Sequence, residues 1–230
     1  MLDTILKKHL DAMGGLRNWD RVESIRLSGI IERDGQSLEI VIIKKRPNQI
    51  RATVTLPLPG NGGKFIQMIR AHDGKNAWSA TRLVGAPEMV KEPMRGNAAD
   101  NLLADGGVLP PLIKLWRGGG DLRLLGVDVF EGTPVFVIES TGETDNAKQH
   151  FYLSTETHLI VAHNRRSPSG MTRVHLSNYR EEQGIVWPMH SLISGDGTGE
   201  SIMTTTSVEI GVGIYEEYFK ADEQSQTANL

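Results

Sequence analysis

The side chains that could carry out chemistry in this 230-residue sequence include seven histidines, three of which lie close together in the chain. His150, His158 and His163 have the residue type, but not the spacing, of a metal site. His158 and His163 are five residues apart in a strand-like stretch, so alternation places their side chains on opposite faces. No HExxH pair occurs anywhere in the sequence. We therefore expect no bound metal.

The acidic pairs and glycine-rich loops show no catalytic pattern either. Glu181-Glu182 and Glu216-Glu217 are neighbours in polar stretches, which is not the convergent arrangement that acid–base catalysis needs. The segment PGNGGKFI resembles a phosphate-binding loop, but Phe65 follows Lys64 where such a loop has Ser or Thr. There is no G-x-S-x-G nucleophile elbow. We predict that the protein is not an enzyme and has no cofactor.

Composition narrows the possible partners. A net charge of −3 and a pI near 6.2, with no basic block, argue against nucleic acid. The chain has no cysteine, which excludes disulfides and thiol chemistry. The first fifteen residues have the pattern of an amphipathic helix and not of a signal peptide. The compartment stays open at this point, because the chain could be cytosolic or the mature part of an exported protein.

The elements that must position any site are mostly strands. A helix over residues 2–13 ends at Gly14-Gly15, and from Val22 the apolar residues recur with period two between short Gly-containing turns. This pattern predicts a mainly β fold with a few helices: about ten or eleven strands in a single curled antiparallel sheet, a half-open β-barrel. We expect one domain over residues 1–220 and a polar, flexible tail over 221–230.

The strand pattern is interrupted once, by an insert at about residues 85–120 that is rich in proline and glycine and predicts two short helices. Glycines at 106–107 and 118–120 could act as hinges. The insert is therefore either a mobile lid over an apolar cavity or a fixed plug that completes the core. In the lid interpretation, the cavity would take an acyl chain. The predicted lipid-binding residues are Met68, Met89, Leu102, Leu103, Leu109, Leu112, Ile113, Leu115 and Trp116.

Three arginines near these apolar residues have two interpretations. Arg70, Arg82 and Arg117 could latch the lid through carbonyl groups or meet a lipid headgroup, or they could be solvated surface charges.

Several stretches resemble one known family. HLDAMGGLRNWDRVESIRLSGII resembles the opening of the outer-membrane lipoprotein-sorting proteins, which are related to the periplasmic carriers of the LolA and LolB type. The segments RPNQIRATVTL, AHDGKNAW, HFYLSTETHLIVAHNRR and LSNYREEQGIVWPMHSLI fit the later strands and turns of that family in the same order. The similarity therefore touches both halves of the chain.

The resemblance implies a function as well as a fold. It implies a half-open barrel with a helical lid over a cavity that holds lipid or the acyl chains of a lipoprotein. It also implies a periplasmic protein whose signal peptide has been removed, with a membrane-bound donor or acceptor protein as a further partner. We expect the protein to be a monomer. It favours the lid over the plug. The alternative is a sensor or scaffold of the same fold that transports nothing and binds a partner protein through the open edge of the barrel.

Overall fold

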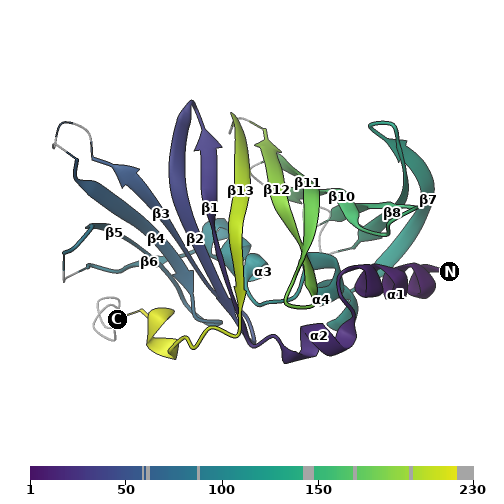
Figure 1. Cartoon of the computed structure of the whole chain (residues 1–230), viewed down its shortest axis with the longest axis horizontal. Coiled ribbons are helices and arrows are strands. Elements are labelled where there is room, and N and C mark those ends of the chain that lie inside the picture. Colours follow the sequence, from purple (N-terminus) through teal and green to yellow (C-terminus); the bar gives the residue numbers. More distant parts are fainter. Residues whose placement is uncertain are drawn as a thin grey trace. The chain divides into compact units, whose positions relative to one another are not determined.

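The computed structural model describes residues 1–58, 60, 63–86, 89–141, 148–167, 170–196 and 199–221. Most of the predicted tail, 222–230, and part of the predicted phosphate-loop-like segment lie outside these residues. In the described part of the chain, four α-helices and one short 3-10 helix accompany the strands (Figure 1). The helices are α1 (Leu2–Ala12), α2 (Leu16–Arg21), α3 (Asn97–Asp105), α4 (Pro111–Arg117) and η2 (Glu216–Tyr218).

Thirteen strands form one sheet within the described residues, in the order β6-β5-β4-β3-β2-β1-β13-β12-β11-β10-β9-β8-β7. Their bounds are β1 (Ser24–Arg33), β2 (Gln36–Lys45), β3 (Gln49–Pro57), β4 (Phe65–His72), β5 (Ala77–Leu83), β6 (Glu92–Met94), β7 (Leu122–Phe130), β8 (Thr133–Ser140), β9 (Gln149–Ser154), β10 (Ile160–Ser167), β11 (Gly170–Glu182), β12 (Ile185–Gly195) and β13 (Gly199–Ile210).

The predicted fold class is confirmed, because the chain is mainly β and its antiparallel sheet is not closed: β6 and β7 are its two edges. The sequence pattern predicted ten or eleven strands. One strand that it did not resolve is β6, whose three residues are too few to show a period of two.

Three of the hairpin turns form at residue pairs whose backbone adopts the left-handed conformation, with positive φ. Asp34-Gly35, Glu131-Gly132 and Gln183-Gly184 each have two successive residues with positive φ. Two-residue hairpin turns of this kind match the twist of the strands that they join, and glycine adopts the second position without strain. These local signals account for the hairpins β1–β2, β7–β8 and β11–β12.

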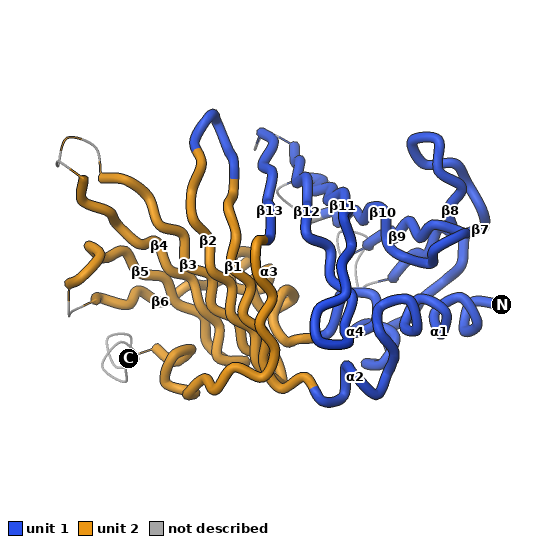
Figure 2. Tube along the Cα trace, viewed as in Figure 1, with its two compact units in different colours: residues 1–21, 32–36, 109–205 blue, residues 22–31, 37–108, 206–230 orange. Residues whose placement is uncertain are grey.

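The chain divides into two compact units (Figure 2). Unit 1 comprises residues 1–21, 32–36 and 109–205, and unit 2 comprises residues 22–31, 37–108 and 206–230. The division passes through the predicted insert between Val108 and Leu109, so α3 belongs to unit 2 and α4 to unit 1. The single domain over 1–220 remains a prediction.

The core of unit 1 lies between two helices and three strands. Ile5 and Leu6 of α1 and Leu112 of α4 pack with Phe151 of β9 and Ile160 of β10. Trp19 of α2 is fully buried and donates its indole N–H to the carbonyl oxygen of Met13, 2.8 Å away.

No helix among the described residues is long and apolar enough to cross a membrane; the longest, α1, has 11 residues.

Candidate functional site

The strands of unit 2 present two faces of different chemistry. Val54 of β3 lies opposite Met68 of β4, which lies opposite Thr81 of β5, and no bulge interrupts these pairings. Because side chains alternate along each strand, the partners in one row share a face. We call the face that carries Val54 and Met68 the apolar face. Its strand side chains include Ile40, Ile42, Ile50, Ala52, Val54 and Met68.

The apolar face is only partly covered. Ile40 and Ile50 are buried, but Ile42 and Val54 are half-buried, and Met68 is 44% exposed. Burial is favourable for such side chains, at about 25 cal/mol per Å². A row of incompletely buried aliphatic side chains therefore offers a surface to an apolar ligand.

Helix α3 is the element that covers part of this face. It contacts β3, β4 and β5. Desolvation lowers the pKa of His72, which lies on the apolar face, and the carboxylates of Asp73 and of Asp100 in α3 oppose that shift. None of the nine residues of α3 is fully buried, and Leu102 and Leu103 are half-buried. The helix is lightly packed.

A cavity of about 260 Å³ lies beside Met68. Arg70, Ser79, Thr81 and Val90 also line it. Arg70 is exposed, and it shares the apolar face because it pairs with Ala52. The structure therefore brings the predicted residues Met68 and Arg70 together at one cavity.

The opposite face of the same strands is covered by the chain's C-terminal segment, residues 211–221, which we call the C-terminal strap. Side chains from several strands donate hydrogen bonds to its carbonyl oxygens: Ser24 to Val212, Lys45 to Ile214, Arg51 to Tyr218 and Trp78 to Phe219. Phe219 is fully buried. These bonds and the buried ring fix the strap on unit 2.

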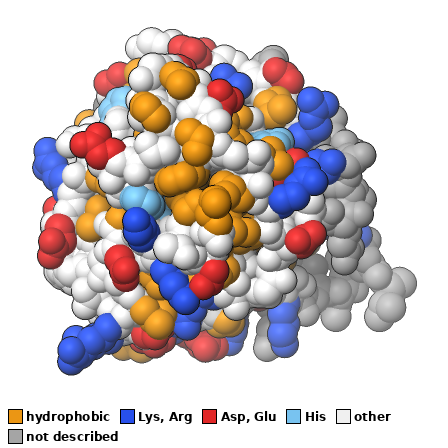
Figure 3. All heavy atoms as spheres, turned by 90° about the vertical axis from the view of Figure 1, so that its right-hand side faces the viewer, with side chains coloured by type: hydrophobic (Ala, Val, Ile, Leu, Met, Phe, Trp, Pro, Cys, Tyr) orange, Lys and Arg blue, Asp and Glu red, His pale blue; other side chains and the backbone are white. Residues whose placement is uncertain are grey.

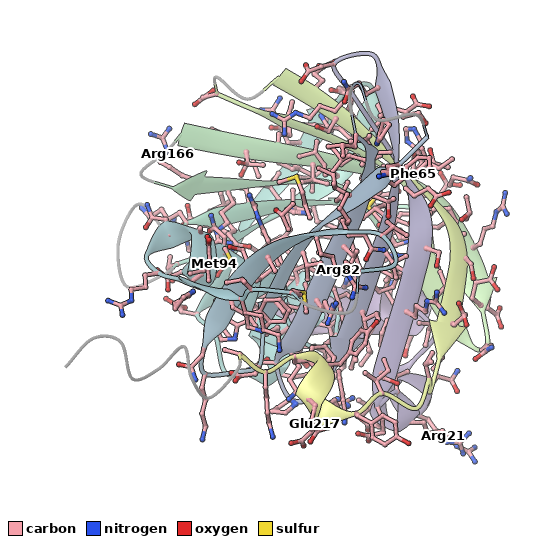
Figure 4. All side chains as sticks on the ribbon, turned by 90° about the vertical axis from the view of Figure 1, so that its left-hand side faces the viewer. Arg21, Phe65, Arg82, Met94, Arg166 and Glu217 are labelled. Carbon is pink, nitrogen blue, oxygen red and sulfur yellow. The ribbon has the colours of Figure 1, made fainter. Side chains whose placement is uncertain are left out.

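A cavity of about 390 Å³ lies between this face and the strap. Arg26 of β1, Arg51 of β3 and Arg82 of β5 line it, together with Tyr215 and Tyr218 of the strap. Arg82 donates from Nε to Gln67, 3.0 Å away. Figure 4 labels Arg82 on β5, and Glu217 on the 3-10 helix of the strap. The predicted residue Arg82 thus lies on the opposite face from Met68 and Arg70.

Met89 also belongs to this side of the sheet. It packs against a cluster of buried residues that includes Ile69, Trp78 and Ala80. Those three residues alternate with the apolar face along β4 and β5. The structure therefore separates Met89 from Met68, although the sequence analysis grouped both as lipid contacts.

The remaining predicted residues lie in unit 1. In α4, Leu112 is 0% exposed and Ile113 is 1% exposed, while Leu115 and Trp116 are half-buried against the same core. Leu109, just before α4, is half-buried. In this structure α4 is thus a packed part of the core of unit 1.

Arg117 forms an ion pair near the surface of unit 1. Its Nη1 lies 2.6 Å from a carboxylate oxygen of Asp20, and the two side chains are 37% and 48% exposed. Exposed pairs of this kind contribute little to stability, typically below about 1 kcal/mol. The pair connects α4 with α2 within unit 1.

Unit 1 also holds a buried polar network. Glu139, with a side chain only 9% exposed, lies 2.9 Å from Arg123 and 3.2 Å from Nε2 of His150. His150 in turn contacts Asn164, which donates to the hydroxyl group of Tyr152. These contacts satisfy a carboxylate that β8 places near the core, as buried charges require. Among the described residues, no group of three or more His, Asp or Glu side chains could hold a metal ion.

Sequence reasoning missed Arg26 and Arg51. Both stand in otherwise apolar strand segments, IRL and QIRATV, where a charged side chain is unusual enough to be a signal. The sequence could not place them beside Arg82, because that requires knowing the order and register of β1, β3 and β5.

Comparison with known proteins identifies the fold. No family model matches the sequence, and no curated protein gives a significant match. A solved DUF1329 family protein from Desulfovibrio piger has a TM-score of 0.60 at 12% identity, with 95% of this chain and 96% of that chain covered.

Two further solved structures have a similar fold. A LolA superfamily protein from Nitrosomonas europaea has a TM-score of 0.57 at 12% identity, covering 95% of this chain and 97% of that chain. An outer membrane lipoprotein-sorting protein domain from Vibrio parahaemolyticus has a TM-score of 0.56 at 13% identity. The comparison covers 94% of each chain. The chain therefore has the fold shared by the LolA superfamily, lipoprotein-sorting domains and DUF1329 proteins.

Proposed function

We propose that the protein is a periplasmic carrier that binds the acyl chains of a lipid or an acylated lipoprotein on the apolar face of unit 2, beneath α3. The observation that carries this proposal is the incomplete cover of that face: Ile42, Val54 and Met68 remain partly exposed beside a helix with no fully buried residue. The likeness in fold to a LolA superfamily protein and a lipoprotein-sorting domain supports it.

The packing of the two insert helices supports a choice of which one a ligand would displace. Lifting α4 would expose Leu112 and Ile113, which are buried at 0% and 1% exposure, and full burial of such side chains is worth about 1.5–3 kcal/mol each. Helix α3 itself contributes only side chains that are already partly exposed, so its removal from the sheet costs less burial of helix side chains. We therefore assign the role of displaceable cover to α3, and the role of fixed core element to α4.

Exchange of the ligand needs no energy source in this scheme. An acyl chain that enters beneath α3 replaces the contacts of Leu102 and Leu103 with contacts of the same apolar kind. Each methylene group that it buries contributes about 0.8 kcal/mol, reduced by the helix contacts that are lost. The two states then differ little in free energy, so a donor or acceptor membrane can shift the population either way.

The decisive test is native mass spectrometry with lipid extraction on protein purified from the periplasm of a Gram-negative host. We expect the wild-type chain to carry a phospholipid, a fatty acid or an acylated peptide. The variant Met68→Glu should lose it, because a charge on the apolar face would have to be buried against the acyl chain.

A matched control lies on the same strand. Phe65 is 47% exposed, similar to Met68 at 44%, but points to the other face of β4. Phe65→Glu should therefore retain the ligand. A wild-type mass that remains free of ligand after incubation with lipid vesicles would overturn the proposal, as would equal loss of ligand in the two variants.

A second candidate function, a scaffold or sensor that binds a partner protein, is favoured by one observation in unit 1. The edge strand β7 exposes a row of apolar side chains: Leu125 at 46%, Val127 at 67% and Val129 at 64%. Figure 3 shows hydrophobic side chains gathered on the corresponding side of the protein. Exposed apolar patches and free strand edges are common protein-docking surfaces.

A further inference from the structure

Unit 2 contains an arginine pocket, the cavity of about 390 Å³ on the face opposite the apolar face. We propose that this pocket is a second binding site, for the phosphate group of a phosphate monoester. This site does not depend on the proposed carrier function, because the sheet itself separates it from Met68 and α3.

The first argument is the unusual state of Arg51. Its side chain is buried, with the residue only 6% exposed, yet no carboxylate is paired with it among the described residues. Nη1 donates to the carbonyl oxygen of Tyr218 at 3.0 Å, and the guanidinium group lies 4.1 Å from the centre of the Tyr218 ring. The Nε atom has no hydrogen-bond partner in the described part of the chain. A buried charge normally has a partner of opposite sign.

The second argument is the charge of the surroundings. Arg26 and Arg82 line the same cavity, and no Asp or Glu is among its lining residues. Burial lowers the pKa of Arg51; Tyr218 opposes this shift, and the positive charge of Arg82 adds to it. The Nε atom of Arg26 also lacks a partner among the described residues, and its one ion pair, with Glu209, spans 3.8 Å. Three arginines thus line one cavity, and the ion pair that the described residues give them is that of Arg26 with Glu209.

These features match a phosphate monoester in both charge and geometry. Guanidinium groups bind phosphate oxygens through paired N–H donors. A phosphate monoester carries a charge of about −1.5 to −2 at pH 7, close to the net charge of three arginines and one glutamate. The volume also exceeds what a bare phosphate needs, and Val41, Ile43 and Ile214 supply apolar walls for the carbon part of the ligand.

The strap makes this site possible. Tyr215 and Tyr218 of the strap line the cavity, and the hydrogen bonds from Lys45 and Trp78 hold the strap in place. The tyrosine hydroxyl groups add possible donors to a phosphate oxygen. Residues far apart in the sequence, from β1 to the strap, are therefore all needed to build the site.

The test is isothermal titration calorimetry of the full chain at constant ionic strength with three probes. These are inorganic phosphate, glycerol 3-phosphate and dioctanoyl phosphatidic acid below its critical micelle concentration. We expect wild-type protein to bind at least one probe, and Arg82→Gln and Arg26→Gln to weaken that binding at least tenfold. Arg180→Gln, at an exposed arginine of β11 in unit 1, should leave it unchanged.

The probes distinguish the source of the phosphate group. Binding of glycerol 3-phosphate would assign a soluble phosphate ester, and binding of phosphatidic acid alone would assign a lipid headgroup. In the second case Met68→Glu must retain the binding, which separates this site from the apolar face. Absence of binding by all three probes, or binding that is unchanged in Arg82→Gln and Arg26→Gln, would overturn the proposal.

Discussion

Single residues inside unit 1 show what burial demands of a polar group. His9 is fully buried in α1, and its Nδ1 donates to the carbonyl oxygen of His158, 2.8 Å away. Its Nε2 has no partner among the described residues. Desolvation lowers the pKa of His9 from 6.5 to about 4, so the ring is neutral in the folded protein at pH 7. Protonation of the His9 imidazole at lower pH therefore favours the unfolded chain over the folded protein.

The sign of the pH dependence follows from that shift. Between pH 6.5 and 4 the unfolded chain binds a proton at His9 that the folded chain does not, so the free energy of unfolding falls as the pH is lowered through this range. We expect His9 to account for a loss of about 2 kcal/mol between pH 7 and pH 5. His163, whose pKa desolvation also lowers to about 4, adds a loss of the same sign.

Urea denaturation at the two pH values checks this prediction. The variant His9→Leu should unfold with a smaller difference between pH 7 and pH 5 than the wild-type protein, although Leu also removes the bond to His158. An unchanged difference would show that His9 is not the titrating group.

At the scale of elements, the two helices of the predicted insert differ in how deeply they are buried. Both of its helices are short, but α3 leaves all of its residues at least partly exposed, while α4 contributes Leu112 and Ile113 to the core of unit 1. Gly106 and Gly107, which the sequence suggested as hinges, are buried against the turn between β2 and β3. A Cβ atom at Gly106 would come within 2.5 Å of the carbonyl oxygen of Asn48. These glycines permit a close backbone approach in this structure.

Thiol labelling can test the different mobility of the two helices. The chain has no cysteine, so Leu103→Cys in α3 and Leu115→Cys in α4 each introduce a unique thiol at a half-buried leucine. We expect a water-soluble maleimide to label Cys at position 103 several-fold faster after lipid loading, because the ligand displaces α3. The rate at position 115 should not change.

Two results would contradict this division of roles. Equal acceleration at the two positions would mean that the insert moves as one lid. No acceleration at position 103 in protein that carries a ligand would mean that α3 is a fixed cover.

At the scale of the whole molecule, the strand order gives the insert its place in the topology. Strand neighbours in the sheet are also neighbours in the chain, except that β1 lies beside β13. The insert contains the edge strand β6, and its helices α3 and α4 lie in the connection from β6 to the other edge strand, β7. The two edges differ. Strand β6 is only three residues long and contains Pro93, features that discourage pairing with another chain, whereas β7 has nine residues and exposes Val127 and Val129.

This difference gives a test of the scaffold alternative. A photo-crosslinking residue at Val127 should give a discrete cross-linked species in cells if a partner docks on β7. The same residue at Val84, which is 52% exposed in unit 2, should not. No discrete product at position 127, or the same products at the two positions, would contradict docking at this edge.

The sequence alone determined the local structure. Period-two hydrophobicity and the X-Gly turns predicted the strands β1 to β5, and the apolar stretches NAADNLLAD and PPLIKLW predicted α3 and α4 within one residue of their ends. The fold class followed from the same patterns and from the family resemblance. Such features depend on neighbours within a few residues, and the sequence therefore contains the information that sets them.

Only the tertiary structure decided which residues meet. A shift of one residue in register reverses the face of every side chain in a strand, and single-strand patterns do not contain the register. For that reason the sequence grouped Met68 with Met89 and Arg70 with Arg82, pairs that the register of β4 and β5 and the packing of Met89 separate. The gathering of Arg26, Arg51 and Arg82 likewise depends on long-range strand pairing and on the C-terminal strap, which no local signal specifies.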